Sequence, residues 1–355
     1  MKSAPFRILL SSAGSYPRSG PAAEMRHLEE TVQAFESGER TTADLVDAQN
    51  SMARRAISDQ VAAGLDIITD GQVRWLDPVS HFARALDNIR LDGSHPFLGT
   101  PQSYRQPVLT GRPLRRGSLI AHEFHFARNA LGHLPTPKGK AGKLSLKPVL
   151  TGPYTLAKLS IADPAARDAA DSCSSLEGRV EAFSDALAGE IKSLVEAGAD
   201  LIQIDEPAAA AFPQDFALVA VGLSALIAAR DQMPAEFRRS LLALYIYFGD
   251  SAPIFEKLQE LPVDLLGLDF ASSPRLSDIV ASSGSSKPLA LGLVSGQDPA
   301  LEDAAAVAGR LERLLPRIPS SPIHLGTSCG LGFLTQAGAT AKLSLLAEIQ
   351  RLVAG

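Results

Sequence analysis

The chain has 355 residues, 45% hydrophobic and 21% charged, with a formal net charge of −5. This length allows one large α/β domain or two ordinary ones. The Lys and Arg residues are scattered and form no basic stripe, which argues against a nucleic-acid partner. Cys173 and Cys329 lie far apart in sequence and make no disulfide framework.

The first residues carry one lysine and a short apolar run, too short for the core of a signal peptide. No uninterrupted apolar stretch of 18 residues occurs, so no membrane partner is expected. We therefore expect a soluble, cytoplasmic protein whose partner is a small-molecule substrate.

Short runs rich in leucine and β-branched residues recur along the chain, each ending in a polar or glycine-rich turn. They are nearly continuous apolar runs, as is typical of parallel strands covered on both faces. The eight predicted strands span 6–12, 65–71, 146–152, 199–207, 241–249, 263–270, 287–296 and 321–330.

Helical patterns with apolar residues every three or four positions separate these runs, most clearly at 44–64, 178–198 and 303–318. Gly64 and Gly198 stand where helices end just before strands, which suits a left-handed cap. Alternating strands and helices predict a parallel sheet, and eight such units favour a closed (β/α)8 TIM barrel, class α/β, as a single domain over 1–355. A dinucleotide-binding sheet is the rival, but no GxGxxG stands between a strand and a helix.

One segment, 88–142, does not fit the repeat and is too long for a simple loop after the second strand. It predicts a strand pair around YRQPVLTGR and a helix around LIAHEFHFARNAL, packed on the barrel as an insertion. Its basic patch consists of Arg112, Arg115 and Arg116. This patch is either a solvent-exposed surface or a binding site for an anionic ligand. His122 and His125 are three residues apart, and a lone pair of histidines at this spacing is weak evidence for a metal.

Polar residues gather where the predicted strands end, and in a (β/α)8 barrel these positions build the active site. Any Ser or Thr among them can instead cap a helix. They are Ser11, Ser12, Ser15, Asp70, Gln72, Thr151, Asp205, Glu206, Tyr245, Tyr247, Asp269, Ser295, Thr327, Ser328 and Cys329.

The acidic residues and the cysteine are the strongest of these candidates. Asp205 and Glu206 are adjacent, so their side chains point to different sides of a strand. We expect Asp205 to face inward and hold a cation such as a substrate ammonium, with Glu206 buttressing a neighbour or capping a helix. Cys329 is either a thiolate activated by nearby amides or a small buried hydrophobic residue. His324 lies inside the last predicted strand, and we expect it to be a core residue.

Four motifs resemble the catalytic barrel of the cobalamin-independent methionine synthase family, in its short single-barrel form. They are AGSYPRS (13–19), LTGPYTL (150–156), GADLIQIDEPA (198–208) and TSCGLGFL (327–334), and TDGQVRWLDPVSHF around the second strand is also similar. The resemblance covers essentially the whole chain in the same order. It implies a methyl or alkyl transferase of methionine biosynthesis, acting on a homocysteine-like thiol or another small amino-acid-like substrate.

The resemblance also implies a zinc ion that activates the thiol and a folate methyl donor. The zinc ligands carry over to Tyr245, Tyr247, Asp269 and Cys329, which we take as the candidate catalytic residues. Tyr245 and Tyr247 replace a His and a Cys, and Asp269 replaces a Glu, which leaves Cys329 and Asp269 as the remaining candidate metal ligands. The sequence therefore predicts that no stoichiometric zinc is held at these four positions.

The resemblance is closer at the positions that bind the substrate amino acid than at the metal-ligand positions. The resemblance places Ser15 and Asp205 at the backbone of the substrate amino acid and puts Gln72 where the family has a Glu that binds its amino group. With Glu206, these are the candidate substrate-binding residues. Leu159 stands where the family has a Trp beside the folate ring. Two alternatives remain open: a metal-free lyase or hydrolase in the same pocket, and a non-catalytic amino-acid-binding paralogue.

Overall fold

The computed structural model describes residues 6–135, 144–165, 173–237, 239–319 and 322–354. The chain divides into two compact units. Unit 1 comprises Met1–Arg74, Glu123–Lys147 and Asp269–Gly355, and unit 2 comprises Trp75–His122 and Pro148–Leu268. The expectation of a single domain over 1–355 stays a prediction.

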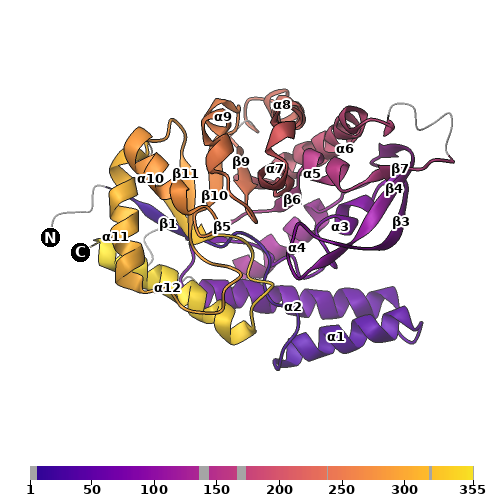
Figure 1. Cartoon of the computed structure of the whole chain (residues 1–355). Coiled ribbons are helices and arrows are strands. Elements are labelled where there is room, and N and C mark those ends of the chain that lie inside the picture. The colour runs from indigo at the N-terminus through magenta and orange to yellow at the C-terminus, as the bar shows by residue number, and fades with distance from the viewer. Residues whose placement is uncertain (1–5, 136–143, 166–172, 238, 320–321, 355) are drawn as a thin grey trace. The chain divides into compact units, whose positions relative to one another are not determined.

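Unit 1 contains a parallel sheet with the strand order β5-β2-β1-β12-β11. These strands are β1 (Ile8–Ser11), β2 (Ile67–Ile68), β5 (Ser145–Leu146), β11 (Leu289–Val294) and β12 (Ile323–Thr327). Its helices are α1 (Ala23–Glu36), α2 (Thr42–Ala62), α10 (Pro274–Ser283), α11 (Ala304–Leu314) with the 3-10 turn η4 (Leu315–Arg317), and α12 (Gln336–Ala354). The long helices α1 and α2 pack side by side (Figure 1).

Unit 2 contains a second run of parallel strands in the order β10-β9-β8-β6. They are β6 (Val149–Thr151), β8 (Leu201–Asp205), β9 (Leu241–Ile246) and β10 (Leu265–Asp269), whose last residue belongs to unit 1. The helices of unit 2 are α3 (Ser80–Ala83), α5 (Pro153–Lys158), α6 (Leu176–Glu196), α7 (Ala208–Ala211), α8 (Phe216–Asp231) and α9 (Phe255–Glu260), with 3-10 turns η2 (Pro213–Asp215) and η3 (Ala252–Ile254).

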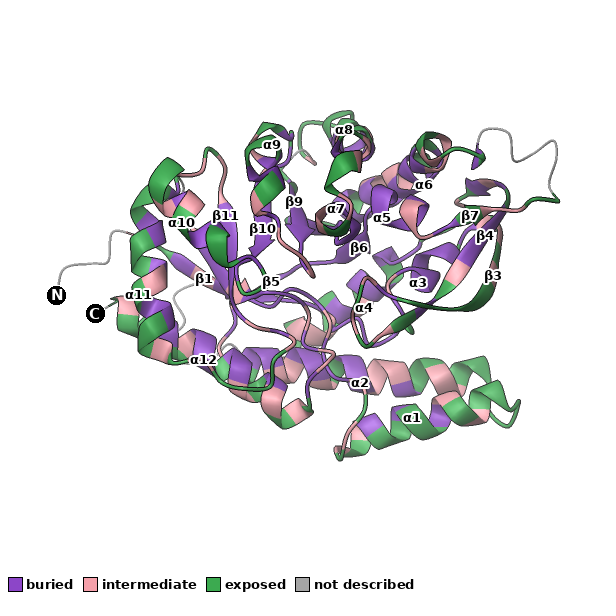
Figure 2. Ribbon diagram, viewed as in Figure 1, coloured by how far each residue is buried: buried purple, intermediate pink, exposed green. Residues whose placement is uncertain are grey.

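All eight predicted strands are present, and the third is divided in two. Its first half is β5, which pairs with β2, and its second half is β6, which pairs with β8. Lys147 and Pro148 separate the halves, and a proline cannot donate a ladder hydrogen bond. Figure 2 shows the strands of these two parallel runs almost wholly buried and the long helices exposed on one side, as the apolar runs of the sequence predict.

The predicted helices begin and end at recognisable caps. Thr41 and Asp44 form a capping box at the start of α2, and the Ser175 side chain accepts a hydrogen bond from the Gly178 amide at the start of α6. Beyond the ends of these helices, Gly64 and Gly198 have φ of 90° and 82°. The left-handed caps predicted from the sequence are therefore confirmed.

The segment inserted after the second strand contains the predicted strand pair and helix. Strands β3 (Asp87–Pro96) and β4 (Ser103–Leu114) form an antiparallel hairpin in unit 2, and β4 also pairs with the short β7 (Ile161–Ala162). Helix α4 (Ala121–Gly132) follows, beginning in unit 2 and continuing in unit 1. Residues 136–143 lie outside the described chain, and the packing of the whole insertion on the barrel stays a prediction.

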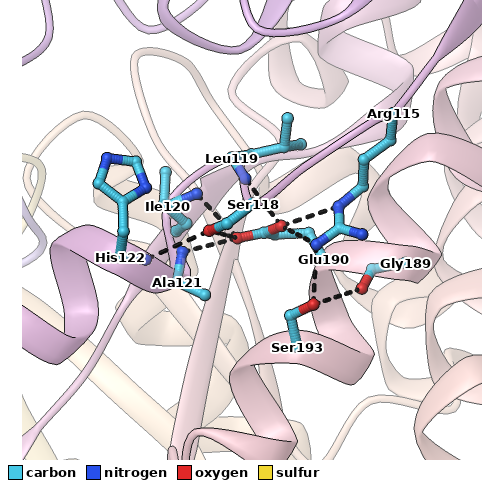
Figure 3. Close-up of polar contacts among 9 residues, drawn as sticks. All are labelled: Arg115, Ser118, Leu119, Ile120, Ala121, His122, Gly189, Glu190 and Ser193. Atoms are coloured by element: carbon cyan, nitrogen blue, oxygen red, sulfur yellow. Dashed lines mark hydrogen bonds and ion pairs between the residues drawn. The ribbon is translucent and has the colours of Figure 1, made fainter.

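The basic patch of the insertion binds carboxylates of the protein itself. Arg115 donates two hydrogen bonds to the buried Glu190 on α6, at 2.9 and 2.8 Å (Figure 3). The same carboxylate accepts amide hydrogens from Leu119, Ile120 and Ala121 and so caps the start of α4.

The other two arginines of this patch make ion pairs nearer the surface. Arg112 pairs with Glu181 and Asp185 of α6, and Arg116 pairs with Asp87 of β3. All three guanidinium groups thus contact acidic residues of unit 2, which favours the structural interpretation of the patch over a binding site for an anionic ligand.

Helix α8 with the preceding turn, Pro213–Asp231, is long and apolar enough to pass a length-and-composition test for a membrane span. Within unit 2 it packs against α5 and α6 as one of the covering helices. A core helix of a water-soluble protein passes the same test, and the contacts of α8 fit that interpretation.

Candidate functional site

Asp205 is the last residue of β8, and its carboxylate is held on both oxygens. Oδ1 accepts a hydrogen bond from Nε2 of Gln203 at 2.6 Å, and Oδ2 accepts one from the Tyr247 hydroxyl at 2.8 Å. The side chain is 4% exposed. Gln203 stands two residues before Asp205 and so shares its face of the strand. The period of two in a strand is the sequence signal for this contact, although Gln203 is not among the site residues predicted from the sequence.

Glu206 is buried, and its side chain caps the start of the neighbouring helix α5 in unit 2. Its carboxylate accepts amide hydrogens from Tyr154 at 2.9 Å and Thr155 at 2.7 Å, at the start of α5. A Cβ added to Gly152 would stand 2.2 Å from Oε1 of Glu206, so only glycine leaves room for this cap. Burial raises the pKa of Glu206 to about 7, against the lowering effect of its hydrogen bonds. This geometry gives Glu206 a positioning role, and its predicted contact with substrate stays a prediction.

The two tyrosines near the end of β9 are buried and have different contacts. Tyr247 donates its hydroxyl hydrogen to Asp205. Tyr245 is opposite Gly267 of β10 in the strand register, and a Cβ on Gly267 would stand 2.5 Å from its ring. The Tyr245 ring therefore lies across the space that this glycine leaves open. The glycine at position 267 is visible in the sequence, but only the pairing of β9 with β10 shows that it makes room for the Tyr245 ring.

In unit 1, Ser15 and the turn after β12 fit closely together. The Ser15 carbonyl accepts the Leu331 amide hydrogen at 2.7 Å, and its Oγ accepts that of Gly332 at 3.3 Å. A Cβ on Gly330 would stand 2.0 Å from Oγ of Ser15. Cys329 is fully buried in this turn, and a Cβ on Gly296 would stand 2.8 Å from its sulfur. Backbone contacts and glycines thus fix both Ser15 and Cys329.

Gln72 and Asp269 also belong to unit 1, and each sits in a local turn. Gln72 has a φ of 52°, its amide donates to Oδ1 of Asp70 at 3.0 Å, and its side chain packs over Gly14. Asp269 is fully buried, and its Oδ1 accepts the amide hydrogens of Ala271 and Ser272. These bonds orient the carboxylate at the end of β10.

Several weaker candidates have structural contacts. Thr151 donates its hydroxyl hydrogen to the Pro78 carbonyl at 2.6 Å. The Ser295 hydroxyl accepts the amide hydrogens of Gln297 and Asp298, as a turn-stabilising serine does. His324 lies inside β12 and is 6% exposed, which confirms its core position.

The predicted site residues fall into two sets. Ser15, Gln72, Asp269 and Cys329 belong to unit 1, whereas Asp205, Glu206, Tyr245 and Tyr247 belong to unit 2. The structure connects Asp205 with Tyr247, and Ser15 with the turn that carries Cys329. Their convergence on one cavity stays a prediction.

Known proteins resemble the chain over nearly its whole length. The family model described as cobalamin-independent synthase, catalytic domain, matches residues 10–351. The chain belongs to this family. The resemblance inferred from the sequence motifs is thereby confirmed, and the chain is a methyltransferase-like enzyme related to methionine synthases.

Individual relatives agree with this assignment. A methionine synthase of Saccharolobus solfataricus is 28% identical over 341 residues, covering 96% of this chain and 93% of the relative. One from Sulfolobus acidocaldarius is 24% identical over 332 residues, covering 93% and 87%.

Two solved structures share the fold. A B12-independent methionine synthase of a Shewanella species, in complex with selenomethionine, matches with a TM-score of 0.73 at 20% identity, covering 99% of this chain and 98% of the other. A putative vitamin-B12 independent methionine synthase of Listeria monocytogenes matches with a TM-score of 0.71 at 20% identity and full coverage of both chains. The predicted (β/α)8 barrel class is confirmed.

The positions where the resemblance implies zinc ligands do not suit that ion. The Tyr247 hydroxyl donates its proton to Asp205, whereas a zinc-bound phenol would be deprotonated. Tyr245 lies against Gly267. Among the described residues, no group of three or more His, Cys, Asp and Glu side chains is arranged to hold a metal. Catalytic zinc usually has three protein ligands, and the residues at these positions do not supply them.

Proposed function

We propose that this protein is a methyltransferase that acts on a small amino-acid-like substrate, with a homocysteine-like thiol as the methyl acceptor. The observation that carries the proposal is the buried Asp205 carboxylate at the end of β8, fixed by Gln203 and Tyr247. Family membership supports the methyl-transfer chemistry, and the Shewanella structure with selenomethionine supports an amino-acid ligand.

Asp205 is suited to bind the ammonium group of such a substrate. Hydrogen bonds from Gln203 and Tyr247 orient its two carboxylate oxygens. A carboxylate forms strong, charge-assisted hydrogen bonds with an ammonium group. Because the carboxylate is already oriented, little freedom is lost when the substrate binds.

The transfer itself needs the substrate sulfur close to the methyl carbon. The sulfur lone pair forms the new bond, the methyl donor keeps the electron pair of the bond that breaks, and the thiol proton leaves. In this proposal the Asp269 carboxylate accepts that proton, and Tyr245, Tyr247 and Cys329 orient the sulfur. A folate methyl donor is part of the proposal, although Leu159 stands at the position that the resemblance associates with a folate-contacting Trp.

The test combines binding with turnover in the full chain. L-Homocysteine and methyltetrahydrofolate are incubated with the wild type, Asp205→Asn and the exposed control Asp278→Asn, and methionine is measured by mass spectrometry. We expect methionine from the wild type and the control, and a loss of kcat/KM of at least about 100-fold in Asp205→Asn, since a charge-assisted contact is lost. Absence of both methionine formation and amino-acid binding would contradict the proposal.

Other outcomes separate the alternatives. Binding of homocysteine without methyl transfer would indicate the non-catalytic amino-acid-binding paralogue. Cleavage of the carbon–sulfur bond, detected as released sulfide, would indicate the metal-free lyase. The soluble cytoplasmic location and the lack of nucleic-acid and membrane partners remain predictions beside this proposal.

A further inference from the structure

The residue after Tyr247 has an unusual backbone conformation. Phe248 has a φ of 65°, in the left-handed region that bulky side chains rarely adopt. Such a conformation persists only where surrounding contacts hold it, and it is common at functional sites. The ring of Tyr247 packs edge-on against that of Phe248, with centroids 4.5 Å apart and an interplanar angle of 80°.

The contact on the other side of Phe248 comes from the inserted hairpin. Phe97, which joins β3 to the hairpin turn, packs edge-on against Phe248 with ring centroids 6.1 Å apart. Tyr104 of β4 supports Phe97 in turn at 6.2 Å. Phe97, Phe248 and Tyr247 therefore form an aromatic row in unit 2, which reaches the Asp205 carboxylate through the Tyr247 hydroxyl.

The turn of the hairpin holds Phe97 firmly. The Phe97 amide donates to the Gln102 carbonyl at 2.9 Å, and the Phe97 carbonyl accepts from both the amide and the hydroxyl of Thr100. Leu98 and Gly99 have φ of 48° and 74°, which closes the turn. The Phe97 side chain is only 1% exposed as a result, an uncommon position for a residue at a hairpin tip.

We propose that Phe97 is a positioning residue of the amino-acid site, acting through Phe248 and Tyr247 on the Asp205 carboxylate. The inference rests on the proposed function and extends its amino-acid site to the inserted hairpin. The inserted hairpin thereby becomes part of ligand recognition.

The experiment measures how well the full chain distinguishes an ammonium-bearing ligand from its deaminated analogue. Affinities for L-methionine and 3-(methylthio)propionate are measured by calorimetry for the wild type, Phe97→Ala, Tyr247→Phe and the double variant. Phe35→Ala, an exposed phenylalanine on α1, is the matched control. Phe97→Leu, which keeps apolar bulk without the ring, is the second variant in case Phe97→Ala fails to fold.

The proposal predicts a preference of the wild type for L-methionine that falls about tenfold in Phe97→Ala, as in Tyr247→Phe, while Phe35→Ala keeps it. The double variant should lose no more than either single variant, because both act on one carboxylate. Equal weakening of both ligands in Phe97→Ala and Phe97→Leu, or additive losses in the double variant, would overturn the inference. A wild type that binds L-methionine no better than its analogue would instead contradict the proposed role of Asp205.

Discussion

The carboxyl ends of β8 and β9 in unit 2 and the turn after β12 in unit 1 show two ways of fixing a candidate site. In unit 2, polar side chains hold one another: Gln203 and Tyr247 hold Asp205, and Glu206 holds the start of α5. In unit 1, Ser15 and Cys329 are fixed by backbone hydrogen bonds and by glycines that leave no space for a side chain.

This difference parallels how far the two regions resemble the family motifs. The turn with Cys329 has the sequence TSCGLGFL, which resembles the family motif, and its geometry depends on Gly330 and on Gly296 beside it. At the end of β9, tyrosines stand where the resemblance implies metal ligands, and a hydrogen bond links Tyr247 to Asp205. A network of side chains can accept different residues more readily than a turn defined by steric fit.

The largest expected effect tests the steric fit beneath Glu206. Gly152→Ala would place a Cβ 2.2 Å from a buried carboxylate oxygen. We expect a loss of about 3 kcal/mol in the free energy of unfolding, because the cap of α5 must also move. Gly309→Ala, in the middle of α11 with nothing within 4 Å, is the control. It should be neutral or gain up to about 1 kcal/mol in urea unfolding. Equal effects of the two substitutions would show that the Glu206 contact is loose.

The second prediction concerns pH, where the two units should act in opposite directions. Burial raises the pKa of Glu206 to about 7, so the folded state keeps its proton longer than the unfolded state does. Its contribution to stability is greatest below its unfolded pKa and is lost as pH rises toward 7. Burial, and then the charge of Lys147, lowers the pKa of His324 to about 4. Its contribution is lost as pH falls from about 6.5 toward 4.

Each trend has a magnitude of about 3 kcal/mol at about 1.4 kcal/mol per pKa unit, so the two largely cancel in the wild type. In Glu206→Gln only the His324 trend remains, so the free energy of unfolding should fall as pH drops toward 4. In His324→Leu only the Glu206 trend remains, so the free energy of unfolding should fall as pH rises toward 7. Urea unfolding at intervals between pH 4 and 8 measures both. Identical pH profiles for the two variants would contradict the assigned pKa shifts.

A smaller effect separates two arginines of the inserted segment. Arg115→Gln removes the charged donor from the fully buried Glu190, and we expect a loss of about 2 kcal/mol. Arg112→Gln breaks ion pairs to carboxylates that are 70% and 63% exposed, and the loss should stay below about 1 kcal/mol. Thermal unfolding of the two variants ranks them, and a reversed order would refute the role assigned to Glu190.

The sequence predicted the strands and principal helices well, because continuous apolar runs and helical periodicity depend on local residues. The placement of Glu190 under the start of α4, and of Tyr245 over Gly267, could not be predicted in this way. Both depend on which distant elements become neighbours. The contact between Phe97 and Phe248 was missed for the same reason, since it joins an inserted hairpin to a strand end far along the chain.

The central claim is that the tyrosines near the end of β9 do not ligate a metal: Tyr247 donates a hydrogen bond to Asp205, and Tyr245 lies against Gly267. Deprotonating one phenol at neutral pH would cost roughly 4 kcal/mol before any coordination energy is gained. Elemental analysis of protein purified without chelator tests the claim most directly. We predict no stoichiometric zinc in the wild type. About one tightly held zinc per chain, lost in a Cys329→Ser variant, would contradict the account and restore a metal-activated thiol.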